Sequence, residues 1–242
     1  MPAPVPAPGK NPGLVNPRRY QDFIELYNQI AKNVLTFKGN RKRLAEILIG
    51  AMPRPQLGRV FQVHGNGWMT KLELATLYLD NPEWLNPFSF FVFFNAYLPP
   101  NRVDNWNAWI NNLGKAFSID EKLIAKAIAQ MPWPLNADQH YPQHANNAHY
   151  FNVLDGWMQN YFEINDKDTV ERLWRLADYA ANRLPPYPNT KDPVEQQFIK
   201  DFNTVAPRLR TEPLLSAGLN WMNPGVWIRA AYTRYQDYYQ VF

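Results

Sequence analysis

The 242 residues carry 46% hydrophobic side chains, no cysteine and a formal charge of +4. A chain of this size buries one good core, or two lobes that share an interface. Without cysteine, disulfides, thiolate nucleophiles and zinc–thiolate centres are excluded. The apolar runs are shorter than the roughly 20 residues of a bilayer span, and the start of the chain lacks the pattern of a secretion signal. We therefore expect an intracellular or virion protein that is not secreted by a conventional signal.

The positive charge is unevenly distributed. Residues 1–59 hold ten Lys and Arg against three acids, so the remainder of the chain is net negative. Such asymmetry indicates a polyanionic partner near one end, although basic side chains also simply solvate surfaces.

Residues 1–17 are predicted to form an extended arm. They contain six prolines and no acid, and proline fixes φ and removes backbone donors. We expect this arm to dock on a neighbouring subunit through its Pro-rich first part, Pro2, Pro4, Pro6, Pro8 and Pro12. The alternative is a disordered tail.

A helical body is predicted over 18–242. Apolar residues from Tyr20 to Leu35 recur at the 3–4 spacing of one helix face. Asn40 can cap a second helix, which begins with Arg41, Lys42 and Arg43. Because cations oppose the macrodipole at a helix N-terminus, this cluster is a candidate anion-binding site.

A β-hairpin is expected near 59–69, with Asn66-Gly67 supplying its positive-φ turn. Two capping boxes, Thr70-x-x-Glu73 and Ser118-x-x-Glu121, predict the starts of later helices.

Half of the fourteen residues from Trp84 to Tyr97 are aromatic and none is charged. Exposing the phenylalanines between them would create an apolar patch that soluble monomers rarely carry. This stretch is therefore either the centre of the core or a subunit contact.

Helical patterns continue to the C-terminus, the last of them over about 225–240. The fold class predicted is mainly α, with about nine or ten helices in one compact or two-lobed body. Prolines mark possible lobe boundaries near 132–142 and 185–190, and no internal repeat is present.

Three histidines, His140, His144 and His149, form the best candidate metal site. Pro142 lies between the first two, so they are not expected to share a helix face. A polar loop is the favoured interpretation, and we expect no cofactor. A metal-dependent enzyme remains the third functional alternative.

No nucleophile elbow, Walker A loop or dinucleotide fingerprint is present. The basic residues, which alternate with aromatic ones, instead predict a binder of single-stranded nucleic acid. The combination of arm, basic first quarter and helical body favours a nucleic-acid-packaging protein of the viral nucleoprotein or coat type. A helical protein–protein interaction module is the second alternative. The predicted phosphate contacts are Arg18, Arg19, Lys38, Arg41, Lys42, Arg43, Arg54, Arg59, Arg229 and Arg234.

Overall fold

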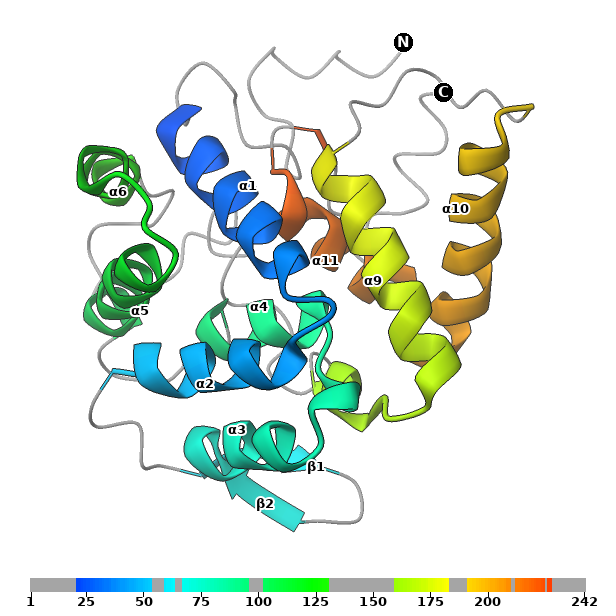
Figure 1. Ribbon diagram of the computed structural model, residues 1–242, viewed down its shortest axis with the longest axis horizontal. Helices are drawn as coiled ribbons and strands as arrows, with labels where there is room; N and C mark the ends of the chain where they lie inside the picture. Colours follow the sequence, from blue (N-terminus) through cyan, green and yellow to red (C-terminus); the bar gives the residue numbers. More distant parts are fainter. Residues whose placement is uncertain are drawn as a thin grey trace, which may run out of the picture.

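The computed structural model describes residues 21–53, 59–63, 67–95, 102–130, 159–182, 191–209, 212–224 and 226–227. This part of the chain is mainly α-helical, as predicted (Figure 1). Its α-helices are α1 (Gln21–Thr36), α2 (Arg41–Ala51), α3 (Lys71–Asp80), α4 (Pro87–Asn95), α5 (Arg102–Ala116), α6 (Glu121–Ala129), α9 (Lys167–Asn182), α10 (Pro193–Val205) and α11 (Glu212–Met222). Three short 3-10 helices accompany them: η1 (Pro82–Trp84), η2 (Gln159–Glu163) and η3 (Ala206–Leu209). The predicted arm, both possible lobe boundaries and the histidine cluster lie outside the described residues.

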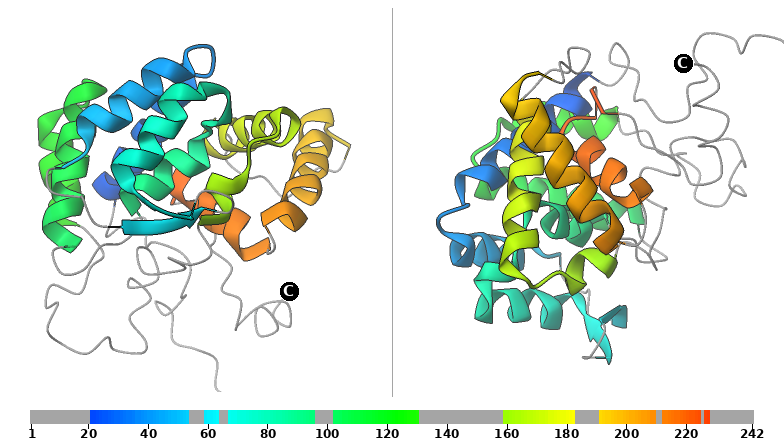
Figure 2. Two further views of the ribbon diagram at one scale, coloured as in Figure 1. Left: turned by 90° about the horizontal axis from the view of Figure 1, so that it is seen from below. Right: turned by 90° about the vertical axis from the view of Figure 1, so that its right-hand side faces the viewer.

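Helix α1 lies between two groups of helices. It packs against α6 on one side and α9 on the other, and Figure 2 shows α5–α6 and α9–α10 flanking the centre of the molecule. The predicted stripe of α1 is buried, including Phe23, Tyr27 and Val34. The first amide groups of α1 are bound by a residue from the end of α6, because Gln130 Oε1 accepts from the backbone N–H of Asp22 at 2.9 Å.

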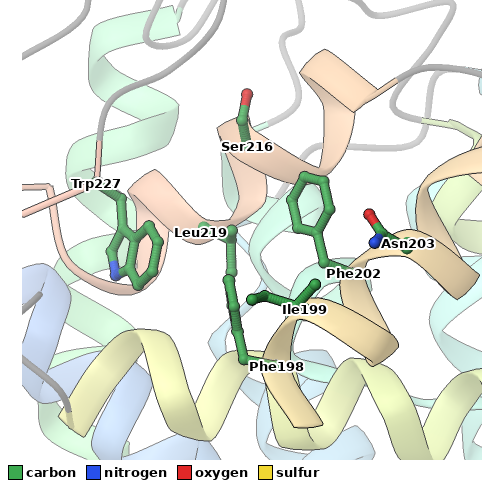
Figure 3. Close-up of a pocket in the computed structure, with 7 residues that line it drawn as sticks. All are labelled: Phe198, Ile199, Phe202, Asn203, Ser216, Leu219 and Trp227. Atoms are coloured by element: carbon green, nitrogen blue, oxygen red, sulfur yellow. The ribbon is translucent and has the colours of Figure 1, made fainter. Parts of the chain in front are cut away.

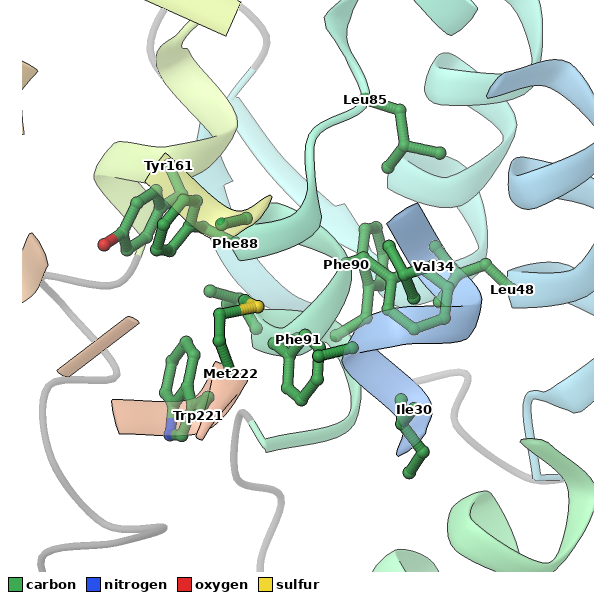
Figure 4. Packing of buried hydrophobic residues seen from close by; sticks show 14 of the residues in the cluster. Ile30, Val34, Leu48, Leu85, Phe88, Phe90, Phe91, Tyr161, Trp221 and Met222 are labelled. Atoms are coloured by element: carbon green, nitrogen blue, oxygen red, sulfur yellow. The ribbon is translucent and has the colours of Figure 1, made fainter. Parts of the chain in front are cut away.

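From Leu85 to Phe93 the aromatic stretch lies at the centre of the core, whereas the side chains of Phe94 and Tyr97 lie outside the described part of the chain. Phe88, Phe90, Phe91 and Phe93 of α4 have no exposed surface. In Figure 4, the ring of Phe90 lies among aliphatic side chains of α1 and α2, while Phe91 faces the end of α11. Phe88 stacks on Tyr161 of η2 with ring centroids 5.5 Å apart. Helix α4 thus brings together elements from both halves of the chain.

Local signals explain how α4 begins and ends. Pro87 stands at its first position, where the missing N–H is harmless. Just before it, Asn86 Oδ1 accepts from Ser89 N at 3.0 Å and Ser89 Oγ accepts from Asn86 N at 3.2 Å. Near the other end, the buried Lys71 donates from Nζ to the carbonyl of Phe93 at 2.7 Å. A cation at this end of the helix complements the macrodipole.

The predicted hairpin is present. Strand β1 (Arg59–Val63) pairs antiparallel with β2 (Gly67–Thr70), and Gly67 has φ +71°. The capping box at Thr70 is also confirmed, since Thr70 Oγ1 accepts from Glu73 N at 3.1 Å and Glu73 Oε2 accepts from Thr70 N at 2.7 Å.

The second predicted capping box is wrong. Helix α6 is capped by Asp120, whose Oδ1 accepts from Lys122 N at 3.0 Å. Ser118 instead closes the preceding helix in the left-handed region, at φ +55°. There the N–H of Ile119 reaches back to the carbonyl of Gly114 at 2.8 Å, which is the pattern of a Schellman ending.

Candidate nucleic-acid interface

The basic residues of the first predicted cluster surround the turn between α1 and α2. Asn40 caps α2 as predicted, with its Oδ1 accepting from Arg43 N at 3.3 Å. The first turn of α2 contains no acid. Lys38, Arg41, Lys42 and Arg43 are the predicted contacts whose side chains the structure describes, and they fall into two groups.

Arg41 belongs to the interior of the fold. Its guanidinium donates to the carbonyl of Lys38 at 3.2 Å, to the carbonyl of Glu83 at 3.0 Å and to the carboxylate of Glu171. The guanidinium carbon also lies 5.1 Å from the ring centroid of Trp174. With only 13% of its side chain exposed, Arg41 links α2 to η1 and α9.

Glu171 of α9 neutralises part of the same cluster. Lys38 Nζ lies 3.4 Å from Oε2 of this carboxylate, whereas Arg41 binds the other oxygen, Oε1. Partial burial opposes ionisation of Glu171, but the hydrogen bond and charge of Arg41, together with Lys38, outweigh it and lower the pKa of the carboxyl group. Two of the four cations are therefore matched to an internal anion.

Lys42 and Arg43 form the second group and lie on the surface. Arg43 pairs with Glu46 one turn along α2, with Nη1 2.8 Å from Oε2 and both side chains well exposed. Exposed pairs of this kind contribute about 0–1 kcal/mol, so a phosphate can replace the carboxylate. Lys42 is exposed and has no ion pair within the described part of the chain.

The charge of the whole described part is close to neutral. It contains seventeen Lys and Arg against eighteen Asp and Glu, whereas the remaining residues contain eight against three. The predicted contacts Arg18, Arg19, Arg54, Arg229 and Arg234 all lie outside the described residues, and Arg59 is described only in its backbone. The net positive charge of the chain is thus carried by residues outside the described part.

Two aromatic residues of the first quarter, Phe23 and Tyr27, are unavailable for stacking on bases. The rings of Phe23 and Tyr27 lie tilted to each other within the core, with centroids 4.6 Å apart, and neither has exposed surface. The sequence pattern alone could not separate such packing aromatics from stacking ones, because both recur at helical spacing.

A buried ion cluster that the sequence did not reveal joins α9 and α10. The carboxylate of Asp201 is 1% exposed and accepts from Arg172 Nη1 at 2.7 Å and from Arg175 Nε at 2.7 Å. Burial opposes its ionisation, but the hydrogen bonds from Arg175, Gln197 and Arg172, together with the charge of Arg175, lower the pKa of Asp201. Both arginines of α9 direct their guanidinium groups to this one carboxylate of α10, so the cluster stabilises the packing of the two helices.

An apolar groove of about 270 Å³ lies between α10 and α11 (Figure 3). Its walls are Phe198, Ile199, Phe202, Asn203, Ser216, Leu219 and Trp227. The sequence does not predict this groove, because its lining residues come from two helices and from the segment that follows them. The one signal for the groove in the sequence is that α10 carries apolar residues at positions where helical spacing places the side chain toward solvent. Ile199 is such a residue, and it is 37% exposed.

The described part of the chain offers no membrane-spanning helix, because none is both long and apolar enough to cross a bilayer. It also contains no group of three His, Asp or Glu side chains arranged to hold a metal ion, and the predicted His140, His144 and His149 lie outside it. Comparison with known proteins identifies no relative: no family model, curated protein or solved structure matches this chain.

Proposed function

We propose that this chain packages nucleic acid as a self-assembling subunit of the viral nucleoprotein or coat type, binding phosphate groups without regard to base sequence. The observation that supports this proposal is the distribution of charge along the sequence: residues 1–20 contain Lys10, Arg18 and Arg19 and no acid, whereas the described part of the chain is close to neutral. Basic segments flanking a compact domain are a recurrent means of binding polyanions.

Two pairs of basic residues are the proposed first contacts. Arg18 and Arg19 directly precede α1 in the sequence, and Lys42 and Arg43 lie in the first turn of α2. In the sequence the two pairs are separated by α1, whose 16 residues span about 24 Å.

Binding of a fluorescein-labelled RNA or DNA homopolymer over a salt series tests the proposal. Lys42→Ala/Arg43→Ala removes two phosphate contacts, so the slope of log affinity against log salt should fall by about 1.4 on single strands. The matched control is Lys122→Ala/Lys126→Ala, which removes the same charge from two exposed positions on α6. Equal effects in both variants would mean that only net charge matters, and no effect in either would refute the contact on α2.

Self-assembly through the Pro-rich arm is the second part of the proposal. Light scattering with the 260/280 nm absorbance ratio, measured on the full chain and on a chain lacking residues 1–17, tests it. We expect large particles with excess absorbance at 260 nm for the full chain, and smaller ones without the arm. An unchanged particle size after truncation would refute docking by the arm.

A helical protein–protein interaction module is the second candidate. Two exposed aliphatic side chains on α10, Val194 and Ile199, and the apolar groove beside Ile199 favour a surface of this kind. A purified chain that is monomeric and free of nucleic acid would favour this candidate over the first.

A further inference from the structure

One wall of the groove between α10 and α11 is formed by Trp227, the last described residue of the chain. Trp227 is held there by a hydrogen bond from its indole Nε1 to the carbonyl of Ala180 at 3.0 Å, and its ring lies 5.5 Å from that of Phe198. In Figure 3 the indole stands across the groove from Ile199 and Phe202, with Leu219 between them. Whatever follows Trp227 therefore starts at the groove.

The backbone leading to Trp227 already forms a helical turn. The N–H of Trp227 donates to the carbonyl of Asn223 at 3.1 Å, which is the i to i−4 bond of an α-helix. Pro224 follows Asn223 at the first position of this turn, where proline is favoured. This turn lies at the beginning of the segment for which the sequence predicts a helix, about 225–240, and the residues after Trp227 lie outside the described part of the chain.

The next fifteen residues carry an apolar stripe with helical spacing. Its members are Ile228, Ala231, Tyr232, Tyr235, Tyr238, Tyr239 and Phe242. On the same helical projection Asp237 falls opposite the stripe, and Arg229 and Arg234 flank it, at about 100–120° from its centre. A helix with a stripe of this kind requires an apolar surface on which to bury it.

We propose that residues 228–242 dock as an amphipathic helix along the α10–α11 groove of their own chain, with the tyrosine-rich stripe against Phe198, Ile199 and Phe202. The occupant is the chain's own segment because Trp227 tethers it to the groove wall, and a short tether gives an effective concentration in the millimolar range. Docking turns Arg229 and Arg234 toward solvent. If the proposed function holds, it presents these two residues as a second basic surface.

Limited trypsin digestion of the full chain, followed by intact mass, tests the docking without nucleic acid. Cleavage after Arg229 or Arg234 removes residues 230–242 or 235–242, which identifies the event among other cuts. The rate of cleavage follows the fraction of molecules in which the segment is undocked, when docking and undocking are fast relative to cleavage. Ile199→Glu places a charge in the groove wall, whereas Val194→Glu places the same charge at an exposed position of α10 that does not line the groove.

A second pair of variants lies within the segment and leaves the body unchanged. Tyr235→Glu interrupts the stripe, and Gln236→Glu adds the same charge beside it. We expect Ile199→Glu and Tyr235→Glu to accelerate the C-terminal cuts by about tenfold or more, the factor that corresponds to a docking free energy reduced by about 1.4 kcal/mol. The wild type, Val194→Glu and Gln236→Glu should all be cut slowly.

Equal rates in all five proteins would overturn the proposal, as would a wild type cut as quickly as Tyr235→Glu. Protection that is lost on dilution of the wild type would overturn the intramolecular assignment and point to a second copy as the occupant. Because no nucleic acid is present, none of these outcomes depends on the proposed packaging function.

Discussion

Arg41→Ala should lower stability and leave nucleic-acid binding almost unchanged. The substitution removes the hydrogen bond to Glu171, the contact with the Trp174 ring and the donor to the carbonyl of Glu83. A hydrogen bond to a charged group contributes about 1.5–3 kcal/mol, and a cation–π contact about 0.5–1 kcal/mol. Because Lys38 remains near Glu171 and compensates in part, we expect a loss of about 2–3 kcal/mol in the free energy of unfolding.

Urea unfolding at neutral and acidic pH measures this loss. The pKa of Glu171 is lowered in the folded state, so its ionised form stabilises the protein above the unfolded pKa of about 4.3. That contribution disappears as the pH falls through the folded pKa, and the wild type and Arg41→Ala should therefore converge in acid.

The companion variant Lys42→Ala/Arg43→Ala should behave in the opposite way. Both side chains are exposed and hold at most a surface ion pair, so the free energy of unfolding should change by less than about 1 kcal/mol, while the salt slope of binding falls. A stable Arg41→Ala with a reduced salt slope would refute the division of this cluster into structural and surface cations.

Two further predictions concern packing and acid stability. Gly218→Ala should lower the free energy of unfolding by about 1–3 kcal/mol, because a Cβ there would lie 2.6 Å from Phe88 Cε1 and 2.7 Å from Tyr161 Oη. The control is Gly50→Ala on α2, where a Cβ meets no atom within 4 Å and should stabilise the protein by up to about 1 kcal/mol. Similar shifts in melting temperature for the two variants would refute the packing argument. Asp201→Asn should cost about 2–3 kcal/mol at neutral pH by removing a buried acceptor from two arginines. Since the folded pKa of Asp201 is lowered, its stabilisation is lost as the pH falls below about 4, and a difference from wild type that persists in strong acid would contradict the assignment.

The fold class could be predicted from the sequence because burial follows periodicity. The stripe of α1 and the phenylalanines of α4 appear in the sequence at the spacing that helix packing requires, and both are buried in the structure. Local chemistry was also sufficient at Asn40, Thr70 and Gly67, where the cap or turn involves residues within three positions of each other.

Local chemistry failed where two signals competed over a few residues. Ser118 and Glu121 have the spacing of a capping box, but Asp120 lies between them and is itself a strong cap. The tight ending of α5 places Ser118 in the left-handed region, from which it cannot start the next helix. Glycine is favoured there, so nothing in the residue type announced this role.

The candidate interface could be predicted only in part, because the availability of a charge depends on distant partners. Arg41 and Lys42 are neighbours in sequence and equal in formal charge, yet Arg41 is bound to a carboxylate 130 residues away and Lys42 is not. The number of basic residues in a cluster therefore overestimates the positive charge that is available to bind a polyanion. In this chain the correction removes Arg41 and weakens Lys38, which shifts the proposed binding toward Lys42 and Arg43 on the surface of α2 and toward Arg18 and Arg19, which precede α1 in the sequence.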